Sequence, residues 1–348
     1  MSVTAQTLTC ALTLTQIRDA LSARPPQTDG RIAGWRSSED ASSNLNAQNG
    51  VPPTAAPQIL PAEGFAPERL AARYYFWEQR KLNDGVSQGW FLDAVDVLIS
   101  VHDNRYLVLW SSHNANLIDP AKGDAARSLT SLMITEDEVR PELSDDSPLR
   151  IIHDDIYLWL TSKADRREPL SGGVVVNTVQ SLTTGENTSG RRVTTRRSGH
   201  LAGAVDLSRI SFLTAVATES TLGPAVVTLG APNDDGTFDQ LTARIWRESQ
   251  FKILTTPSHI RAGVYDNTQK RLHLVHAFAY RYIPLIISER LSDDDWTDAR
   301  RGRLVIEEQI ELARAFRDLA QANPLWPAYA AENGDEVFST PAATEAPG

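Results

Sequence analysis

The sequence predicts an α+β protein in which helices pack on a mostly antiparallel sheet. Short runs rich in β-branched and aromatic residues, separated by turn residues, fill residues 224–278 and predict successive antiparallel strands. Two further runs of this kind flank the turn at residues 102–104 and predict a hairpin. Elsewhere, apolar residues recur at three- and four-residue spacing, which is typical of helices with one buried face.

Residues 1–24 are expected to form a strand followed by a helix. Threonine alternates with apolar residues over residues 7–14, so one face of this strand is buried. Thr15 offers an N-cap for the helix, which Pro25 ends. The next segment, residues 25–64, is rich in Pro, Ser, Asn and Gln and contains almost no large apolar side chains. Such a composition cannot offset the entropy of ordering, so a flexible linker is predicted.

Residues 65–165 are expected to contain a helix, a hairpin and a second helix. The first helix is placed at residues 65–82, where apolar and aromatic residues share one stripe and a proline lies in the first turn. Strands at residues 91–101 and 105–112 form the hairpin. The second helix covers residues 120–133, and an acidic stretch follows it.

Residues 166–325 are expected to form an antiparallel sheet with helices that cap it. One helix is predicted at residues 206–221, between strands. The last helix, residues 303–321, has an apolar face wide enough to cover one side of the sheet. Residues 326–348 are rich in Pro, Ala and acidic residues, and a disordered acidic tail is predicted there.

Composition limits the location and the partners of the protein. The chain has 348 residues, a formal net charge of −10 and no apolar run close to the roughly 20 residues that span a bilayer. Its N-terminus lacks a basic region before an apolar stretch, so a cytoplasmic location without membrane contact is expected. Cys10 is the single cysteine, which excludes an intramolecular disulfide and a thiolate cage for zinc. The sequence predicts no cofactor and no resident metal.

One segment matches a catalytic motif. Gly85-Val86-Ser87-Gln88-Gly89 fits the G-x-S-x-G pattern of serine esterases. In those enzymes a strand precedes the serine and a helix follows it, because the sharp turn between them exposes the hydroxyl. The order predicted around Ser87 is the reverse, with a helix before it and a strand after it. A plain turn at Gly85 and Gly89 is therefore the favoured interpretation, and Ser87 is a weak candidate nucleophile.

A second candidate for chemistry is His153 with Asp154 and Asp155. Neighbouring imidazole and carboxylate groups can bind a divalent metal or act as acid and base near neutral pH. The chain lacks the second helical motif that an HD-type phosphohydrolase requires, so these residues are weak candidates too. A hydrolase is kept as an alternative function, either serine esterase-like through Ser87 or a metal-dependent phosphohydrolase or nuclease through His153 and Asp154.

Two groups of cations favour nucleic acid as a ligand. Strand alternation between residues 241 and 278 separates an apolar face from a face of cations and aromatic residues. That second face is predicted to hold Arg244, Trp246, Lys252, Arg261, Tyr265 and Arg271. A glycine- and serine-rich loop adds Arg191, Arg192, Arg196 and Arg197. Guanidinium and ammonium groups bind phosphates, and planar rings stack on bases.

The leading hypothesis is a nucleic-acid-associated binding or accessory subunit of a larger cytoplasmic assembly. Two plainer interpretations stay open: the basic face is an ordinary solvated surface, or the acidic stretch at residues 136–146 neutralises the arginine loop. A third function is a protein–protein scaffold, in which the aromatic segment Tyr74–Trp77 and the C-terminal helix dock other subunits or a second copy. The sequence does not decide whether the protein is an enzyme.

Overall fold

Eleven strands form a single sheet in the part of the chain that the structure describes. The computed structural model describes residues 2–38, 45–82, 88–134, 140–153, 155–180, 224–232, 238–259 and 267–333. The strands are β1 (Ser2–Thr9), β2 (Gly34–Arg36), β3 (Gln58–Leu60), β4 (Arg69–Lys81), β5 (Gln88–His102), β6 (Arg105–Trp110), β7 (Glu142–Ser144), β8 (Val175–Gln180), β9 (Ala225–Pro232), β10 (Phe238–Ile245) and β11 (Gln250–Ile253). Each pair of neighbours is antiparallel.

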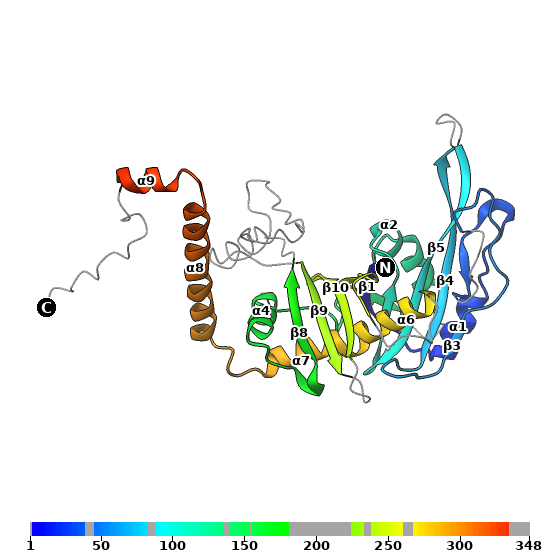
Figure 1. Cartoon of the computed structure of the whole chain (residues 1–348). Coiled ribbons are helices and arrows are strands. Elements are labelled where there is room, and N and C mark those ends of the chain that lie inside the picture. The colour runs from blue at the N-terminus through cyan, green and yellow to red at the C-terminus, as the bar shows by residue number, and fades with distance from the viewer. Residues whose placement is uncertain are drawn as a thin grey trace.

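Helices flank this sheet, so the predicted α+β class with a mostly antiparallel sheet is confirmed (Figure 1). The helices are α1 (Leu14–Ser22), α2 (Ala115–Ile118), α3 (Asp124–Ser131), α4 (Ile156–Arg166), α6 (Asn267–Ala277), α7 (Ile283–Ser292), α8 (Asp298–Gln321) and α9 (Trp326–Asn333). A π-helical turn, Phe278–Tyr282, joins α6 to α7, and short 3-10 turns lie at Asp29–Arg31 and Ser171–Gly173.

The N-terminal strand β1 lies in the middle of the sheet. The strand order is β2, β4, β5, β6, β1, β11, β10, β9, β8, with β3 paired to β4 and β7 paired to β1. β1 pairs with β6 through residues 4–8 and with β11 through residues 2–4. It therefore joins two groups of strands that come from separate parts of the sequence, β2–β6 and β8–β11.

Helices α4, α6 and α7 cover one face of the sheet, which we call the first face (Figure 1). The ring of Phe251 on β11 stacks on Phe278, with 6.3 Å between the ring centroids. The Tyr157 hydroxyl of α4 donates a 3.1 Å hydrogen bond to the carbonyl of Ile245 on β10. These contacts seal a continuous apolar core along the first face.

On the opposite, second face, α1, α2 and α3 cover only the strands from β2 to β1 in the sheet order. Trp35 and Trp110 are both fully buried in this core. The Trp35 ring packs against Tyr74 at 5.0 Å, and its indole Nε1 donates a 3.0 Å hydrogen bond to Ser128 of α3. No described helix contributes to this core over β8–β11, so the second face of those strands is left to other contacts.

Strand β4, Arg69–Lys81, occupies most of residues 65–82, so the prediction of a helix there is wrong. Leu70 and Tyr74 are four residues apart, which places them on one side of a helix but also on one face of a strand. Both lie in the core of the second face. Ala71 and Tyr75 are buried as well. Because this half of β4 is buried on both faces, it shows no simple alternation, and its aromatic composition was the better guide.

Two short strands lie within residues 25–64, where the composition predicts a flexible linker. β2 and β3 both pair with β4, and Trp35 of β2 is fully buried. The prediction is therefore corrected at these strands. Trp35 supplies buried apolar surface, and pairing with β4 supplies backbone hydrogen bonds. The average composition of the segment does not reveal either contribution.

Residues 267–277 form helix α6, not the turn and strand predicted there. Leu274 and Phe278 are fully buried and four residues apart, as expected on the inner side of a helix. Burial, together with the nearby charge of Arg69, lowers the pKa of His276 to about 3, so the imidazole is neutral in this core. Short apolar runs fit both periods, which explains the error.

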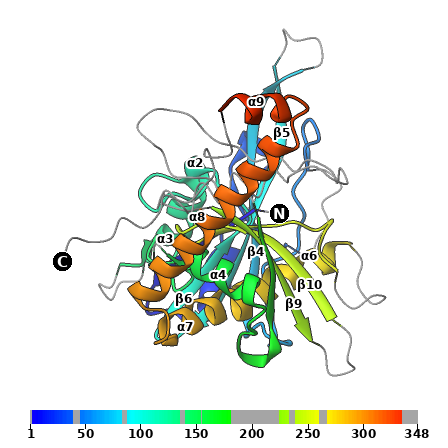
Figure 2. The ribbon, with the colours of Figure 1, turned by 60° about the vertical axis from the view of Figure 1, so that its left-hand side comes forward.

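Helix α8 occupies the predicted position but does not cover the sheet. Leu304 and Val305, near its start, are buried in the first-face core. Beyond them the apolar face is open, with exposed fractions of 56% for Ile306, 48% for Ile310, 48% for Phe316 and 43% for Leu319. The helix extends away from the sheet past β8, and α9 turns across its far end (Figure 1, Figure 2). Helices α6 and α7 already occupy the face that α8 was expected to cover.

A buried amide on β1 provides a test of the central strand. Gln6 is 1% exposed, and its Nε2 donates to the carbonyl of Ile118 and to Asp145, at 2.9 Å and 2.8 Å. Its Oε1 accepts a 2.7 Å hydrogen bond from the indole of Trp110. Gln6→Leu leaves the Ile118 carbonyl and the Trp110 indole buried without this partner, so the free energy of unfolding should fall by about 2 kcal/mol or more in urea denaturation. The exposed Gln79→Leu is the matched control, and an equal loss in both variants would contradict the assigned role of Gln6.

Candidate nucleic-acid interface

The second face of β8–β11 carries mainly polar side chains, and we call it the polar face. Strand register aligns them in rows across the sheet. The first row is Val175, Gly230, Gln240 and His259. The second row is Thr178, Thr228 and Thr242. The third row is Val226, Arg244, Lys252 and Ser2.

The third row brings cations and aromatic rings together. Arg244 and Lys252 are directly opposite each other on β10 and β11. The Arg244 guanidinium lies 5.8 Å from the centroid of the Trp246 ring, within the range of a cation–π contact. The His113 ring meets Trp246 edge-on, with 5.7 Å between centroids. Three of the predicted residues therefore form one cluster, to which the structure adds His113.

The electrostatic state of this cluster follows from its burial. Burial, reinforced by the nearby positive charge of Lys252, lowers the pKa of His113, so this ring is neutral at pH 7. A 2.7 Å hydrogen bond joins its Nδ1 to the hydroxyl of Thr4 on β1. The Lys252 ammonium is exposed, whereas Arg244 and Trp246 are partly buried. The cluster thus offers exposed positive charge beside the edges of aromatic rings, a combination suited to phosphates and bases.

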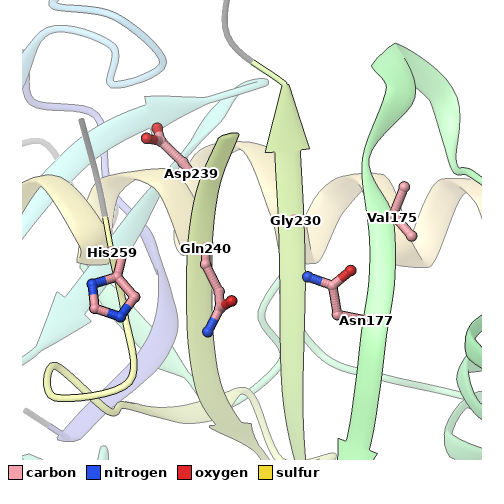
Figure 3. Close-up of a pocket in the computed structure, with 6 residues that line it drawn as sticks. All are labelled: Val175, Asn177, Gly230, Asp239, Gln240 and His259. Carbon is pink, nitrogen blue, oxygen red and sulfur yellow. The ribbon is translucent and has the colours of Figure 1, made fainter. Parts of the chain in front are cut away.

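The first row contains a hollow of about 400 Å³ (Figure 3). Its lining residues are Val175, Asn177, Gly230, Asp239, Gln240 and His259. A register shift in β8 between Val176 and Thr178 leaves Asn177 without a partner on β9. This side chain points across the strand toward Gly230 (Figure 3). Such bulges re-aim single side chains, and they recur at functional sites.

The remaining predicted cations do not join this cluster in the described residues. Arg271 lies on α6, which packs on the first face, so it is on the other side of the sheet from Arg244. Arg261, Tyr265 and the four arginines of the loop lie outside the described residues. The loop arginines are Arg191, Arg192, Arg196 and Arg197.

The candidate catalytic residues lie away from the polar face or outside the described residues. Ser87 and Asp154 lie outside the described residues. The backbone carbonyl of His153 accepts a hydrogen bond from the amide of Ile156, in the first turn of α4. The Asp155 carboxylate accepts hydrogen bonds from Arg290 of α7, at 3.2 Å and 2.7 Å, and from the indole of Trp296, at 2.8 Å. Its oxygens are therefore occupied by structural donors.

Asp155 belongs to a network of charges that fastens the start of α8 to α4. Asp293 accepts from the indole of Trp159 at 2.8 Å and pairs with Lys163 at 3.1 Å. Glu168 pairs with Lys163 and with Arg300 of α8, at 3.0 Å and 3.2 Å. The network members are Asp155, Trp159, Lys163, Glu168, Arg290, Asp293, Trp296 and Arg300. Burial opposes ionisation of Asp155, but the hydrogen bonds from Arg290 and Trp296 outweigh it and hold the carboxyl pKa below its usual value.

Across the described ranges, no group of three or more His, Cys, Asp or Glu side chains is arranged to hold a metal ion. No helix in these ranges is both long enough and apolar enough to cross a membrane. Comparisons of the chain with models of protein families, with curated proteins and with solved structures find no match. The geometry of the polar face and of α8 therefore carries the functional argument.

Parts of the polar face escaped prediction. Gln240 shares the face of Arg244 by simple alternation and could have been found with it. Asn177 could not, because the bulge that turns it toward Gly230 interrupts the alternation of β8. His113 follows β6 in the other group of strands, and only the central position of β1 brings it to Trp246.

Asp155→Asn should destabilise the protein in a pH-dependent way. The variant leaves Arg290 short of an ionised partner in a partly buried site, so at pH 7 its free energy of unfolding should fall by about 3 kcal/mol. The folded-state pKa of Asp155 is lowered, so its contribution is present above its ordinary pKa of about 4 and is lost as pH falls through the lowered value. The stability difference between wild type and variant should therefore shrink in urea denaturation at progressively lower pH.

Asp19→Asn is the control, because the Asp19 carboxylate is 61% exposed and its ion pair with Arg18 is a surface contact. Its effect should stay within about 0.5 kcal/mol. The indole N–H signal of Trp296 in an NMR spectrum provides a local readout, since this indole donates directly to Asp155. A Trp296 environment that does not change in Asp155→Asn would contradict the assigned role of the network.

Proposed function

We propose that the protein is a nucleic-acid-associated accessory subunit that holds a single strand against its polar face. One observation carries the proposal: Arg244, Lys252 and Trp246 come together, beside His113, on a half of the sheet that no described helix covers. A sheet surface of this kind offers ring edges and planes for bases and cations for phosphates. A cytoplasmic location belongs to the same proposal.

The charge of the chain limits how this binding works. The formal net charge of −10 repels a polyanion at long range, so attraction has to come from local cations. Salt screens charges beyond about 8 Å at physiological ionic strength. The cluster of Arg244 and Lys252 can therefore act only on phosphates that are already close to the polar face. Affinity should be modest and strongly dependent on salt.

A second candidate function is association through α8, favoured by the exposed apolar face of this helix. Leu312, Phe316 and Leu319 follow the four- and three-residue spacing of helices that pair along an apolar seam. Large exposed apolar patches on a soluble protein mark interaction surfaces. We infer that a second copy of the chain covers the face, because an identical seam buries both helices in one symmetric contact.

Alanine variants of Arg244 and Lys252 test the proposed function. Binding of a labelled single-stranded oligonucleotide, measured by fluorescence anisotropy, should weaken with rising salt. Each variant should reduce affinity for every sequence alike and lower the salt slope by about 1, because each removes one phosphate contact. Arg271→Ala is the matched control, since Arg271 is exposed on α6 over the opposite face. No binding by wild type at low salt, or equal losses in Arg244→Ala and Arg271→Ala, would contradict the proposal.

A double variant of α8 tests the second candidate. Phe316→Asp with Leu319→Asp places two charges on this seam without touching the buried start of the helix. Light scattering after size exclusion should show wild type shifting toward a dimer as concentration rises, while the variant stays monomeric. Arg314→Asp alters charge elsewhere on the same exposed helix, in an ion pair with Glu311, and should leave the shift intact. A wild type that is monomeric at every concentration contradicts pairing through α8.

A further inference from the structure

The hollow on the polar face is lined at one position of its row by a residue without a side chain. Gly230 lies between Val175 and Gln240 in the cross-strand row. A Cβ added to Gly230 would lie 2.9 Å from Nδ2 of Asn177, closer than real contacts allow. Its backbone does not have the positive φ that demands glycine. The glycine therefore makes room for the Asn177 amide, which lies against it and lines the hollow with it.

The walls of the hollow offer hydrogen-bonding groups from two amides and an imidazole. Asn177 lies on one side of Gly230, and Gln240 with His259 lies on the other (Figure 3). The Gln240 Nε2 donates a 3.0 Å hydrogen bond to the carbonyl of Pro257, which fixes the orientation of its amide. The backbone of Gln240 is held by two 2.7 Å hydrogen bonds with His259. The polar groups are thus set on rigid backbone, as specific recognition requires.

The carboxylate at the rim is directed elsewhere. Asp239 precedes Gln240 on β10 and so projects toward the first face. Burial raises the pKa of Tyr282, which lies in the first-face core, and the nearby charge of Asp239 raises it further. Figure 3 shows the Asp239 side chain pointing away from Asn177. The interior of the hollow therefore presents amides and an imidazole.

The hollow and the cation cluster lie on one line along β10. Gln240 and Arg244 are four residues apart on the same face, which corresponds to about 13 Å at roughly 3.3 Å per residue. The hydroxyls of Thr228 and Thr242 fill the row between them and hydrogen bond to each other at 3.1 Å. Sheet surfaces that bind single strands accommodate two or three bases over such a span.

We propose that the hollow formed by Asn177, Gly230, Gln240 and His259 binds one unstacked base of a nucleic-acid strand whose phosphates lie at Arg244 and Lys252. This inference rests on the proposed function and adds base recognition to it. Side-chain amides present a donor and an acceptor side by side, the pattern that matches the edge of adenine. Adenine is therefore the preferred base. Contacts in the hollow select the base, while the cations attract phosphates regardless of the nucleic-acid sequence.

The test compares oligonucleotides of a single base with pocket variants of the full chain. Wild type should bind an adenine oligonucleotide about tenfold more tightly than a thymine or cytosine one, as expected for one good amide–base pair. Gly230→Val fills the hollow, and Asn177→Ala and Gln240→Ala each remove an amide. All three should erase the preference for adenine while leaving the salt slope unchanged, because no charge is removed. Asn177 is exposed, so Asn177→Ala keeps the test valid if Gly230→Val fails to fold.

Gln250→Ala is the matched control, since Gln250 lies on β11 two residues before Lys252 and does not line the hollow. It should keep the adenine preference. Equal binding of all single-base oligonucleotides by wild type, or a preference that survives all three pocket variants, overturns the base pocket and leaves the proposed function standing. Failure of wild type to bind any oligonucleotide at low salt overturns the proposed function and the pocket together.

Discussion

The pairing of β1 with strands on both of its sides is the constraint on which the rest of the structure depends. β6 and β11 would each present an open edge without it, and open edges invite aggregation. The same strand also aligns the residues of the cation cluster. Thr4 donates to the carbonyl of Ser112 at 2.7 Å and hydrogen bonds to His113, which brings that ring against Trp246 from the other group of strands. The central position of β1 therefore both completes the sheet and brings the residues of the cation cluster together.

A second constraint acts on the buried carboxylates between α4, α7 and α8. Asp155 and Asp293 are largely buried, and a buried carboxylate is tolerated only where donors surround it. Two indoles, a lysine and an arginine donate to these two carboxylates. A network satisfied in this way orients the elements that it joins. It fixes the start of α8 and thereby directs the rest of that helix away from the sheet.

The sequence predicted strands that turn residues bound clearly and failed where a local pattern fits two structures. The β5–β6 hairpin and β9–β11 are short β-branched and aromatic runs between turns, and alternation along β10 and β11 placed Arg244 and Lys252 on one face. β4 is buried on both faces, and α6 contains apolar runs that fit either period. The burial of Trp35 could not be predicted for a different reason: it depends on Tyr74 of β4 and Ser128 of α3, which are distant in sequence. The hollow depends on a bulge and on the absence of a side chain, and neither leaves a periodic signal.

Under the proposed function, the polar face and the exposed apolar face of α8 complement each other. The polar face has few described cations on a chain of net charge −10, so it should bind free nucleic acid weakly. Pairing of two copies through α8 would change that balance, because a strand held by one polar face would meet the second at an effective concentration in the millimolar range. Weak contacts then suffice, and base recognition at Gly230 gains importance relative to charge. In this proposal the exposed apolar face of α8 provides association, and the polar face provides contacts to the strand.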